Sequence, residues 1–172
     1  MTQKTTIPIT AKNVLAMLPP YPIVLVSTQT NIITINQVMY FTFAPLRIGI
    51  AVAHVRYTYA LLRKEGEFVI NVPGAELVDA VKRCGTISGR KGNKFAAVGL
   101  TRRPSTQVAA VRIAECAAHI ECRVEREVAF ERRTWFVGKV VAASQSEGHS
   151  GLESLLCGRS DYRLPGEVVA VR

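Results

Sequence analysis

Alternating apolar and polar residues predict a chain built mainly of β-strands. The clearest alternation covers Ala117 to Val128, where apolar side chains face one way and charged side chains the other. A second group of strands is expected from short apolar, β-branched runs: Pro22 to Thr28, Ile32 to Val38, the start of Leu46 to Tyr59, Glu67 to Val72 and Thr134 to Ala143. The closing segment GEVVAVR, residues 166–172, is a further candidate for a short strand.

Helical spacing of apolar residues occurs in three short stretches. Helices are expected at Thr10 to Leu18, Thr58 to Glu65 and Ala75 to Cys84. Met39 to Pro45 is aromatic and irregular, and it is expected to form a loop over the sheet. Because neighbouring strands read as antiparallel and no βαβ repeat occurs, residues 1–172 are expected to form one mainly β domain, a closed or split β-barrel of Greek-key type with short helices.

Composition narrows the functional classes. The 172 residues carry 22 Lys+Arg against 13 Asp+Glu, a net charge of +9 that favours anionic ligands or partners. The basic residues are interspersed with acids and form no basic tail, which disfavours nucleic-acid binding. No apolar run reaches the length of a membrane helix and the N-terminus lacks a secretory pattern, so a cytoplasmic protein without a membrane segment is expected.

The four cysteines form no C-x-x-C pair. Cys116, His119 and Cys122 have suggestive spacing, but on a strand His119 would point away from both cysteines. We therefore expect small buried hydrophobic thiols and no metal site. Trp135 is likewise expected to be a core residue.

Two stretches carry candidate ligand-binding chemistry. Arg56 and Thr58 lie where the strand that begins at Leu46 gives way to a helix, and an Arg with a free helix N-terminus suits a phosphate. Gly85 to Phe95 combines glycines, Ser88, Arg90 and lysines, which suits close approach to an anion, although it lacks the P-loop spacing. Alternatives remain for both stretches: Arg56 could be a solvated side chain at an ordinary turn, and Gly85 to Phe95 could be a flexible basic loop.

Taken in order, these segments resemble the flavin reductase-like, flavoredoxin-type family with the FMN-binding split barrel. The matching segments run from about Pro20 to Val169: PIVLVST at 22–28, Asn31 to Asn36, FTFAP at 41–45, Arg56-Tyr57-Thr58, EFVINVP at 67–73, Cys84-Gly85 through Ser88-Gly89-Arg90 to Lys94-Phe95, Gly158 to Tyr162, and Gly166 to Val169. Each segment is weak alone, but the ordered set is fairly specific. Asn36 stands where many relatives have Ser, Gln37 where a Trp is common, and Lys91 where an acidic residue is common.

The resemblance implies an FMN-binding homodimer with the flavin near the subunit interface. Carried over by position, Thr34 and Asn36 would lie near the flavin; Arg56, Tyr57 and Thr58 would serve its phosphate side; Ser88, Arg90 and Lys94 would complete the site. His54 could touch the ligand or be an ordinary turn residue. No side chain is expected to be a catalytic nucleophile or base, because the cofactor carries the chemistry.

Three functions are consistent with these residues. The first is an oxidoreductase that moves hydride from NADH or NADPH to flavin and then to an acceptor. The second is a flavoredoxin-like electron carrier that receives electrons from another redox protein. The third is a non-catalytic binding module that keeps the fold. The sequence does not distinguish FMN from FAD, or a bound cofactor from a flavin substrate.

Overall fold

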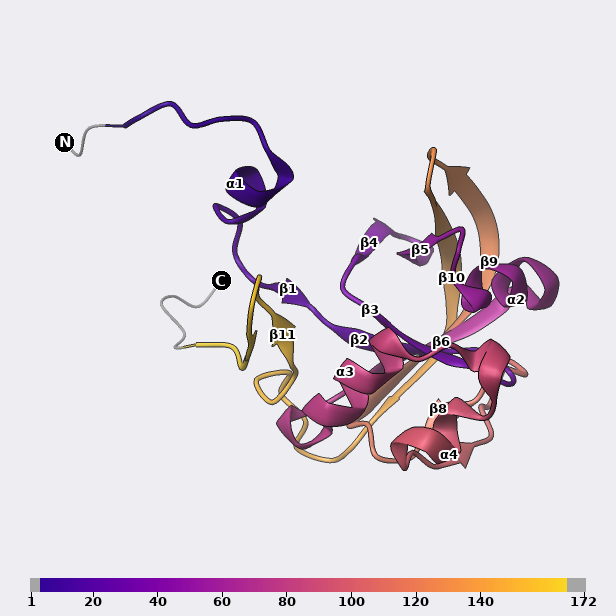
Figure 1. The fold of residues 1–172 in the computed structure, drawn as a ribbon. Coiled ribbons are helices and arrows are strands. Elements are labelled where there is room, and N and C mark those ends of the chain that lie inside the picture. The colour runs from indigo at the N-terminus through magenta and orange to yellow at the C-terminus, as the bar shows by residue number, and fades with distance from the viewer. Residues whose placement is uncertain (1–3, 167–172) are drawn as a thin grey trace.

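The computed structural model describes residues 4–166, and its main element is a seven-stranded sheet (Figure 1). The strand order is β3-β2-β6-β9-β10-β5-β4, and every neighbouring pair is antiparallel. The bounds are β2 Val24–Ser27, β3 Ile32–Ile35, β4 Val38–Phe43, β5 Leu46–Ala53, β6 Glu67–Val72, β9 Ala118–Ala129 and β10 Arg133–Gln145. The predicted mainly β, antiparallel split-barrel class is thereby confirmed.

Shorter elements surround this sheet. A three-stranded sheet contains β1 Tyr21–Pro22, β11 Leu156–Cys157 and β12 Tyr162–Arg163, and a two-stranded sheet contains β7 Arg102–Arg103 and β8 Arg112–Ile113. The helices are α1 Ala11–Leu15, α2 Tyr57–Glu65, α3 Val78–Thr86 and α4 Lys94–Val98, with 3-10 turns η1 Ala75–Leu77 and η2 Gly89–Lys91. Most of the closing segment predicted as a strand, residues 167–172, lies outside the described residues. None of the helices in residues 4–166 has the length and apolar character needed to cross a bilayer.

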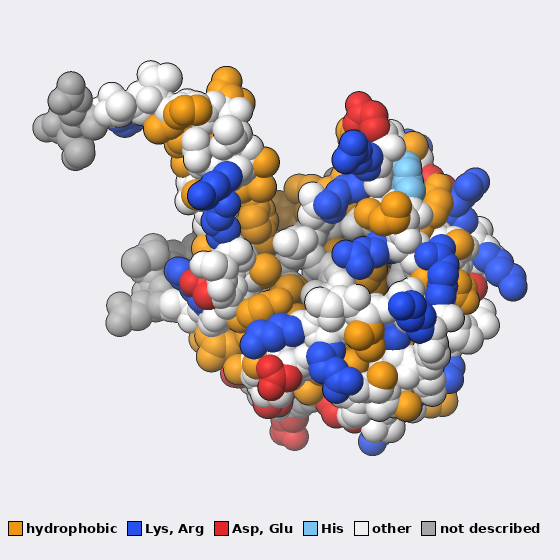
Figure 2. All heavy atoms as spheres, in the orientation of Figure 1, with side chains coloured by type: hydrophobic (Ala, Val, Ile, Leu, Met, Phe, Trp, Pro, Cys, Tyr) orange, Lys and Arg blue, Asp and Glu red, His pale blue; other side chains and the backbone are white. Residues whose placement is uncertain are grey.

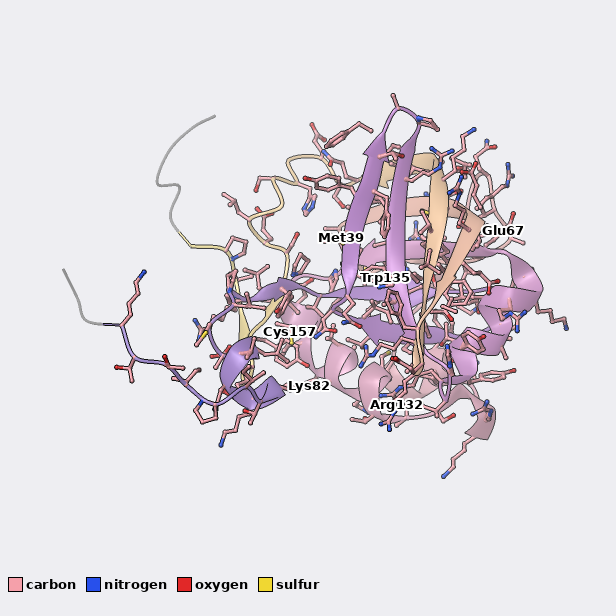
Figure 3. The ribbon with its side chains drawn as sticks, turned by 90° about the horizontal axis from the view of Figure 1, so that it is seen from above. Met39, Glu67, Lys82, Arg132, Trp135 and Cys157 are labelled. Atoms are coloured by element: carbon pink, nitrogen blue, oxygen red, sulfur yellow. The ribbon has the colours of Figure 1, made fainter. Side chains whose placement is uncertain are left out.

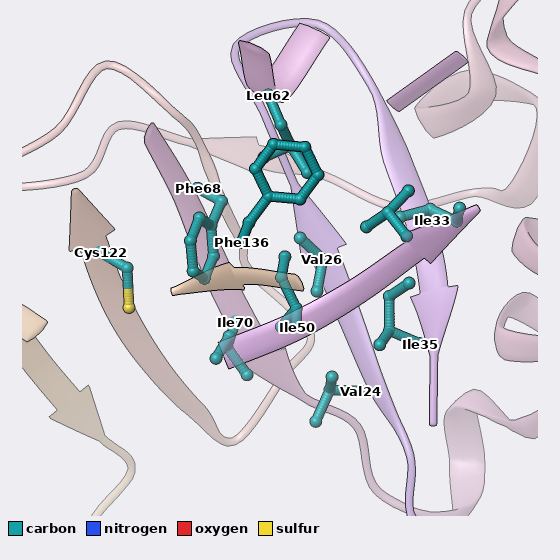
Figure 4. Close-up of a cluster of buried hydrophobic side chains, with 11 residues drawn as sticks. Val24, Val26, Ile33, Ile35, Ile50, Leu62, Phe68, Ile70, Cys122 and Phe136 are labelled. Carbon is teal, nitrogen blue, oxygen red and sulfur yellow. The ribbon is translucent and has the colours of Figure 1, made fainter. Parts of the chain in front are cut away.

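Inward-facing side chains from strands that lie far apart in the sheet form one core. Val24 and Val26 of β2 point into the barrel, while Leu25 and Ile23, which directly precedes the strand, point to its outer side. The eleven residues of the barrel core are Val24, Val26, Ile33, Ile35, Ile50, Val52, Leu62, Phe68, Ile70, Cys122 and Phe136 (Figure 4). Because β3 and β5 both contribute to this cluster, the sheet curls around it.

A second core lies outside the barrel wall. Val81 and Cys84 of α3 and Phe95 of α4 pack against Leu25 and Ile32 on the outer face of β2 and β3. The Thr34 hydroxyl also donates to the carbonyl oxygen of Val81 at 2.5 Å. These contacts hold the segment that follows α3 beside the start of α2.

Two predictions from sequence were wrong. Residues 39–43 of the predicted loop form, together with Val38, the edge strand β4, which pairs with β5 with an irregularity between Tyr40 and Thr42. Most of its side chains are exposed, so the buried–exposed alternation by which a strand is recognised is missing.

Trp135 is half-buried and lies outside the barrel core. It sits on the opposite face of β10 from Phe136, next to the hairpin that carries Met39 (Figure 3), and its ring contacts the Phe41 ring edge-on with centroids 5.7 Å apart. The aromatic side chain suggested a core residue, but Trp135 alternates with Phe136 along β10 and therefore points to the face opposite the barrel core.

Truncating the barrel core should destabilise the protein strongly. Phe68 is fully buried, so Phe68→Ala should lower the free energy of unfolding by about 3–5 kcal/mol in a urea titration. Ile9→Ala is the control, because Ile9 is 95% exposed and its truncation should change stability by less than about 0.5 kcal/mol. Equal effects of the two substitutions would contradict the assignment of this core.

Candidate functional site

A pocket of about 270 Å³ lies where β5 ends, α2 begins and the η2 turn approaches. Six of the nine residues predicted for the site line it: Arg56, Tyr57, Thr58, Ser88, Arg90 and Lys94. They come from two segments about thirty residues apart in the chain. No Asp or Glu within residues 4–166 lines this pocket.

The N-terminus of α2 forms one wall of the pocket. Arg56 occupies the N-cap position in an extended conformation, and no side chain caps the helix. The first N–H groups of a helix have no partner within it, and together with the helix dipole they favour an anion. Thr58 is buried, and its Oγ1 accepts a hydrogen bond from Asn31 Nδ2 at 2.9 Å, which leaves its hydroxyl proton available to a ligand.

Two arginines join the walls of the pocket. Arg56 Nη1 donates to the carbonyl oxygen of Gly85 at 3.2 Å, and Arg90 Nη1 donates to that of Val55 at 3.4 Å. The Arg90 guanidinium also lies over the Tyr57 ring, 5.4 Å from its centroid. Neither arginine forms an ion pair with a described acidic residue. Each guanidinium therefore keeps N–H donors for an anionic ligand.

Lys94 places a cation at the back of the pocket. It is only 3% exposed, and its Nζ donates to the carbonyl oxygen of Cys84 at 2.7 Å. Burial lowers the pKa of Lys94; Cys84 opposes this shift, and the charge of Arg56 adds to it. One carbonyl satisfies only one of the three ammonium donors, so a bound anion would stabilise the charged form.

Asn31 is a pocket residue that sequence reasoning missed as a site residue. It is 3% exposed, and its Oδ1 has no hydrogen-bond partner among the described residues. A Cβ on Gly89 would lie 2.1 Å from that oxygen, so the backbone of Gly89 passes directly over the amide. The sequence offered only a polar residue in a turn, because Asn31 meets Thr58 and Gly89 through the tertiary fold.

The other three predicted residues lie elsewhere. Thr34 is beside Gly85 under α3, and its hydroxyl is bonded to Val81. Asn36 lines a separate hollow of about 430 Å³ together with Tyr21 and Cys157. His54 does not line the pocket: its Nε2 is 3.0 Å from Thr134 Oγ1, and its ring packs on Tyr59.

The cysteines are not arranged as the ligands of a metal ion. All four are free; Cys84, Cys116 and Cys122 are buried as predicted, and Cys157 is partly exposed. Burial raises the pKa of Cys84 to about 11 and that of Cys122 to about 12. His119 contacts Asn71 Oδ1 through Nδ1 at 3.1 Å. Within the described part of the chain, no three His, Cys, Asp or Glu side chains gather as a metal site would require.

Comparison with known proteins identifies relatives of this chain. The family model described as "flavin reductase like domain" matches residues 17–164. An uncharacterized protein of Archaeoglobus fulgidus is 39% identical over 117 residues, which cover 68% of this chain and 66% of the relative. An uncharacterized protein of Pyrococcus abyssi is 36% identical over 119 residues, which cover 69% and 68%. The match thus spans about two thirds of these relatives.

Solved structures share the fold over nearly the whole chain. The flavoredoxin of Desulfovibrio vulgaris (Miyazaki F) superposes with a TM-score of 0.85 at 24% identity, covering 98% of this chain and 97% of that one. An FMN-binding protein from Thermus thermophilus superposes with a TM-score of 0.83 at 20% identity, covering 100% and 99%. At these identities the likeness establishes the fold only.

The close approach of Gly89 to Asn31 can be tested directly. In Gly89→Ala the new Cβ would collide with Asn31 Oδ1, so the η2 turn must move away from Thr58 and widen the pocket. We expect FMN affinity, measured by quenching of flavin fluorescence, to fall about tenfold or more. Gly166→Ala is the control, since a Cβ there meets nothing within 4 Å. Unchanged FMN affinity in Gly89→Ala would show that the close approach of Gly89 to Asn31 does not shape the flavin-binding pocket.

The charge of Lys94 predicts a pH dependence. The second pKa of a phosphate monoester is about 6, so the phosphate of FMN is fully ionised above about pH 7. Because the pKa of Lys94 is below its usual value, the ammonium is lost at lower pH than that of an exposed lysine, and FMN affinity should fall as pH rises through that pKa. Lys94→Met should bind FMN about tenfold more weakly at pH 7 and lose this pH dependence. If the unsubstituted protein and Lys94→Met show identical pH profiles of FMN affinity, Lys94 is not the source of the pH dependence.

Proposed function

The chain belongs to the flavin reductase-like family, and from this premise we propose that it is an FMN-binding oxidoreductase that moves hydride from NADH or NADPH to flavin and passes electrons to an acceptor. Membership of this family supports a general function, that of a flavin-binding redox protein. FMN, the nicotinamide donor and the site residues are the specific parts of the proposal.

One observation supports FMN most strongly. The buried Lys94 ammonium, the uncapped start of α2 and the unpartnered oxygen of Asn31 all belong to a single small pocket. FMN offers a phosphate dianion for the first two and ribityl hydroxyl donors for the third. The residues present therefore fit this cofactor.

We assign the following roles to the side chains. Arg56, Arg90 and Lys94 neutralise the phosphate charge, while Thr58 and Ser88 donate hydroxyl hydrogen bonds to it. Asn31 orients Thr58 and accepts from the ribityl chain. Thr34 lies on β3 and Asn36 directly follows that strand, and we assign both to the ring side of the flavin, as the family resemblance implies. When bound, the flavin supplies the redox chemistry, since its ring accepts hydride and passes electrons on.

The proposal includes a homodimer, as the family resemblance implies. The β4–β5 hairpin exposes Tyr40 and Phe43, the latter by 76%, and Phe130 at the β9–β10 turn is also exposed. Large exposed apolar patches on a globular protein mark interaction surfaces. A mass near 18.8 kDa by light scattering, that of one chain, would contradict the dimer.

A flavoredoxin-like electron carrier remains the second candidate. The net charge of +9 and the unpaired arginines suit an acidic redox partner. Anaerobic mixing of the flavin-loaded protein with NADH or NADPH separates the two functions. Bleaching of the flavin spectrum supports the oxidoreductase, and a loaded protein that stays yellow supports the carrier. A protein that cannot be loaded with FMN supports the binding module instead.

Removing one pocket cation should weaken FMN binding. Arg90→Ala deletes a guanidinium at the mouth of the pocket, and the loss of a charge-assisted contact corresponds to about a 10–100-fold weaker Kd in a fluorescence titration. Arg103→Ala removes an exposed arginine of β7 outside the pocket and should bind FMN as the unchanged protein does. If both variants bind equally well, Arg90 does not serve the flavin.

A further inference from the structure

Residues 7–18, which precede β1, are here named the N-terminal arm, and they project away from the barrel (Figure 1). The centre of the arm is the five-residue helix α1, which Thr10 caps by accepting from the N–H of Asn13 at 3.2 Å. Within the described chain, no residue of α1 is buried. A helix this short has little stability in water on its own, so the arm lacks the tertiary packing that would hold it. Large apolar side chains are exposed along it: Ile7, Ile9, Val14, Leu15, Met17 and Leu18.

A hollow of about 430 Å³ lies at the base of the arm, where the arm meets the small sheet of β1, β11 and β12. Leu18 of the arm lines it together with Tyr21 and Cys157 of the small sheet. Pro19 and Pro20 join the arm to β1, and their fixed φ angles stiffen this connection. Figure 2 shows hydrophobic side chains along the arm and in the gap between the arm and the body. The hollow therefore offers apolar surface to an occupant from outside the chain.

The edge strand β4 is the second apolar surface that the described chain leaves uncovered. Because β4 ends the strand order, one side of its backbone offers N–H and C=O groups outside the ladder. Residues 38–46 carry no charged side chain, and the rings of Tyr40, Phe41 and Phe43 are exposed, that of Phe43 most of all. Proteins usually protect an edge strand with charges or cover it. The absence of charge here indicates that β4 is covered in the assembled protein.

The exposed area of the chain exceeds that of a folded monomer of its mass. A monomer of 18.8 kDa exposes about 8,300 Å². This chain exposes 10911 Å², an excess of about 2,600 Å². An obligate homodimer hides about 1,000–2,500 Å² of each partner, so the excess is large enough for an interface with a second copy.

The two uncovered surfaces complement each other in shape. One is a hollow beside the arm, and the other is a projecting hairpin with an aromatic edge. Arg159 also lines the hollow, and a guanidinium packs favourably on an aromatic ring. In a dimer with a two-fold axis each contact occurs twice, with the roles of the two chains exchanged. A second copy would thus cover both surfaces of each chain at once, whereas an unrelated partner would have to match each surface separately.

We propose that the β4–β5 hairpin of a second copy of this chain enters the hollow at the base of the N-terminal arm, and that the exchange is reciprocal. In this arrangement the Phe43 ring of one protomer lies against Leu18 of its partner, and the arm covers the open edge of β4. The arm gains the tertiary packing that it lacks in one chain. The inference rests on the homodimer of the proposed function and names its contact surfaces, but it does not depend on the redox chemistry.

The dissociation constant of the dimer tests both surfaces. The full chain is diluted in steps, and its mass is followed by analytical ultracentrifugation. Phe43→Glu and Leu18→Glu each place a carboxylate in the proposed interface, so each should raise the dissociation constant at least about tenfold. Leu152→Glu is the matched control, because Leu152 is an exposed apolar residue outside the hollow and outside β4. It should change the dissociation constant by less than about threefold.

A thiol cross-link tests the contact itself. Cys157 lines the hollow and is partly exposed, whereas the other three cysteines are buried. In Phe43→Cys, a short bismaleimide should join the new thiol to the partner's Cys157 and give a covalent dimer on a denaturing gel. The covalent dimer should disappear when Cys157→Ser is added to Phe43→Cys. Leu152→Cys should give no covalent dimer under the same conditions.

The possible failures are distinguishable. A dimer that gives no cross-link in Phe43→Cys, or that Phe43→Glu leaves unchanged, overturns this contact and leaves the proposed homodimer intact. A mass of 18.8 kDa at every concentration overturns both the contact and the homodimer. Titration of the same protein with FMN tests flavin binding separately, since neither Phe43 nor Leu18 lines the pocket at α2.

Discussion

The packing of α3 across the outer face of β2 and β3 is the constraint on which the candidate site depends. Val81 and Cys84 anchor the helix against Leu25 and Ile32, and the Thr34 hydroxyl bonds to the carbonyl oxygen of Val81. This contact fixes where α3 ends and therefore where the chain from Gly85 to Lys94 runs. Without it, Ser88 and Arg90 would belong to an ordinary solvated loop, far from the start of α2.

Electrostatics then determines what the assembled pocket can hold. Arg56, Arg90 and Lys94 converge without an acidic partner from the described residues, and the α2 N-terminus adds a positive dipole end. Placing like charges together and burying one of them is unfavourable in the free protein. The lowered pKa of Lys94 is the local sign of that cost, and an anionic ligand relieves it.

Strands with regular alternation were predictable from the sequence, because each has one face in the barrel core. Edge strand β4 was not, since its aromatic side chains are exposed on both faces. Six predicted site residues line one pocket, and the sequence pointed to them because cations, hydroxyls and glycines cluster in two short segments and match a family pattern. Asn31 was missed because its role depends on Gly89 and Thr58, which only the fold brings to it. Asn36 and His54 have suitable chemistry, but each lies just after the end of a strand, β3 and β5 respectively, and contacts other residues: Asn36 lines a separate hollow, and His54 lies against Thr134.

The measurement that tests the central claim most directly compares the affinities of the flavin-free protein for FMN and riboflavin. These ligands share the same ring and ribityl chain and differ only in the phosphate. If the pocket at α2 is a phosphate site, FMN should bind at least 100-fold more tightly, a difference of about 2.7 kcal/mol. Equal affinities would show that the buried Lys94, the two arginines and the helix N-terminus do not hold the flavin phosphate.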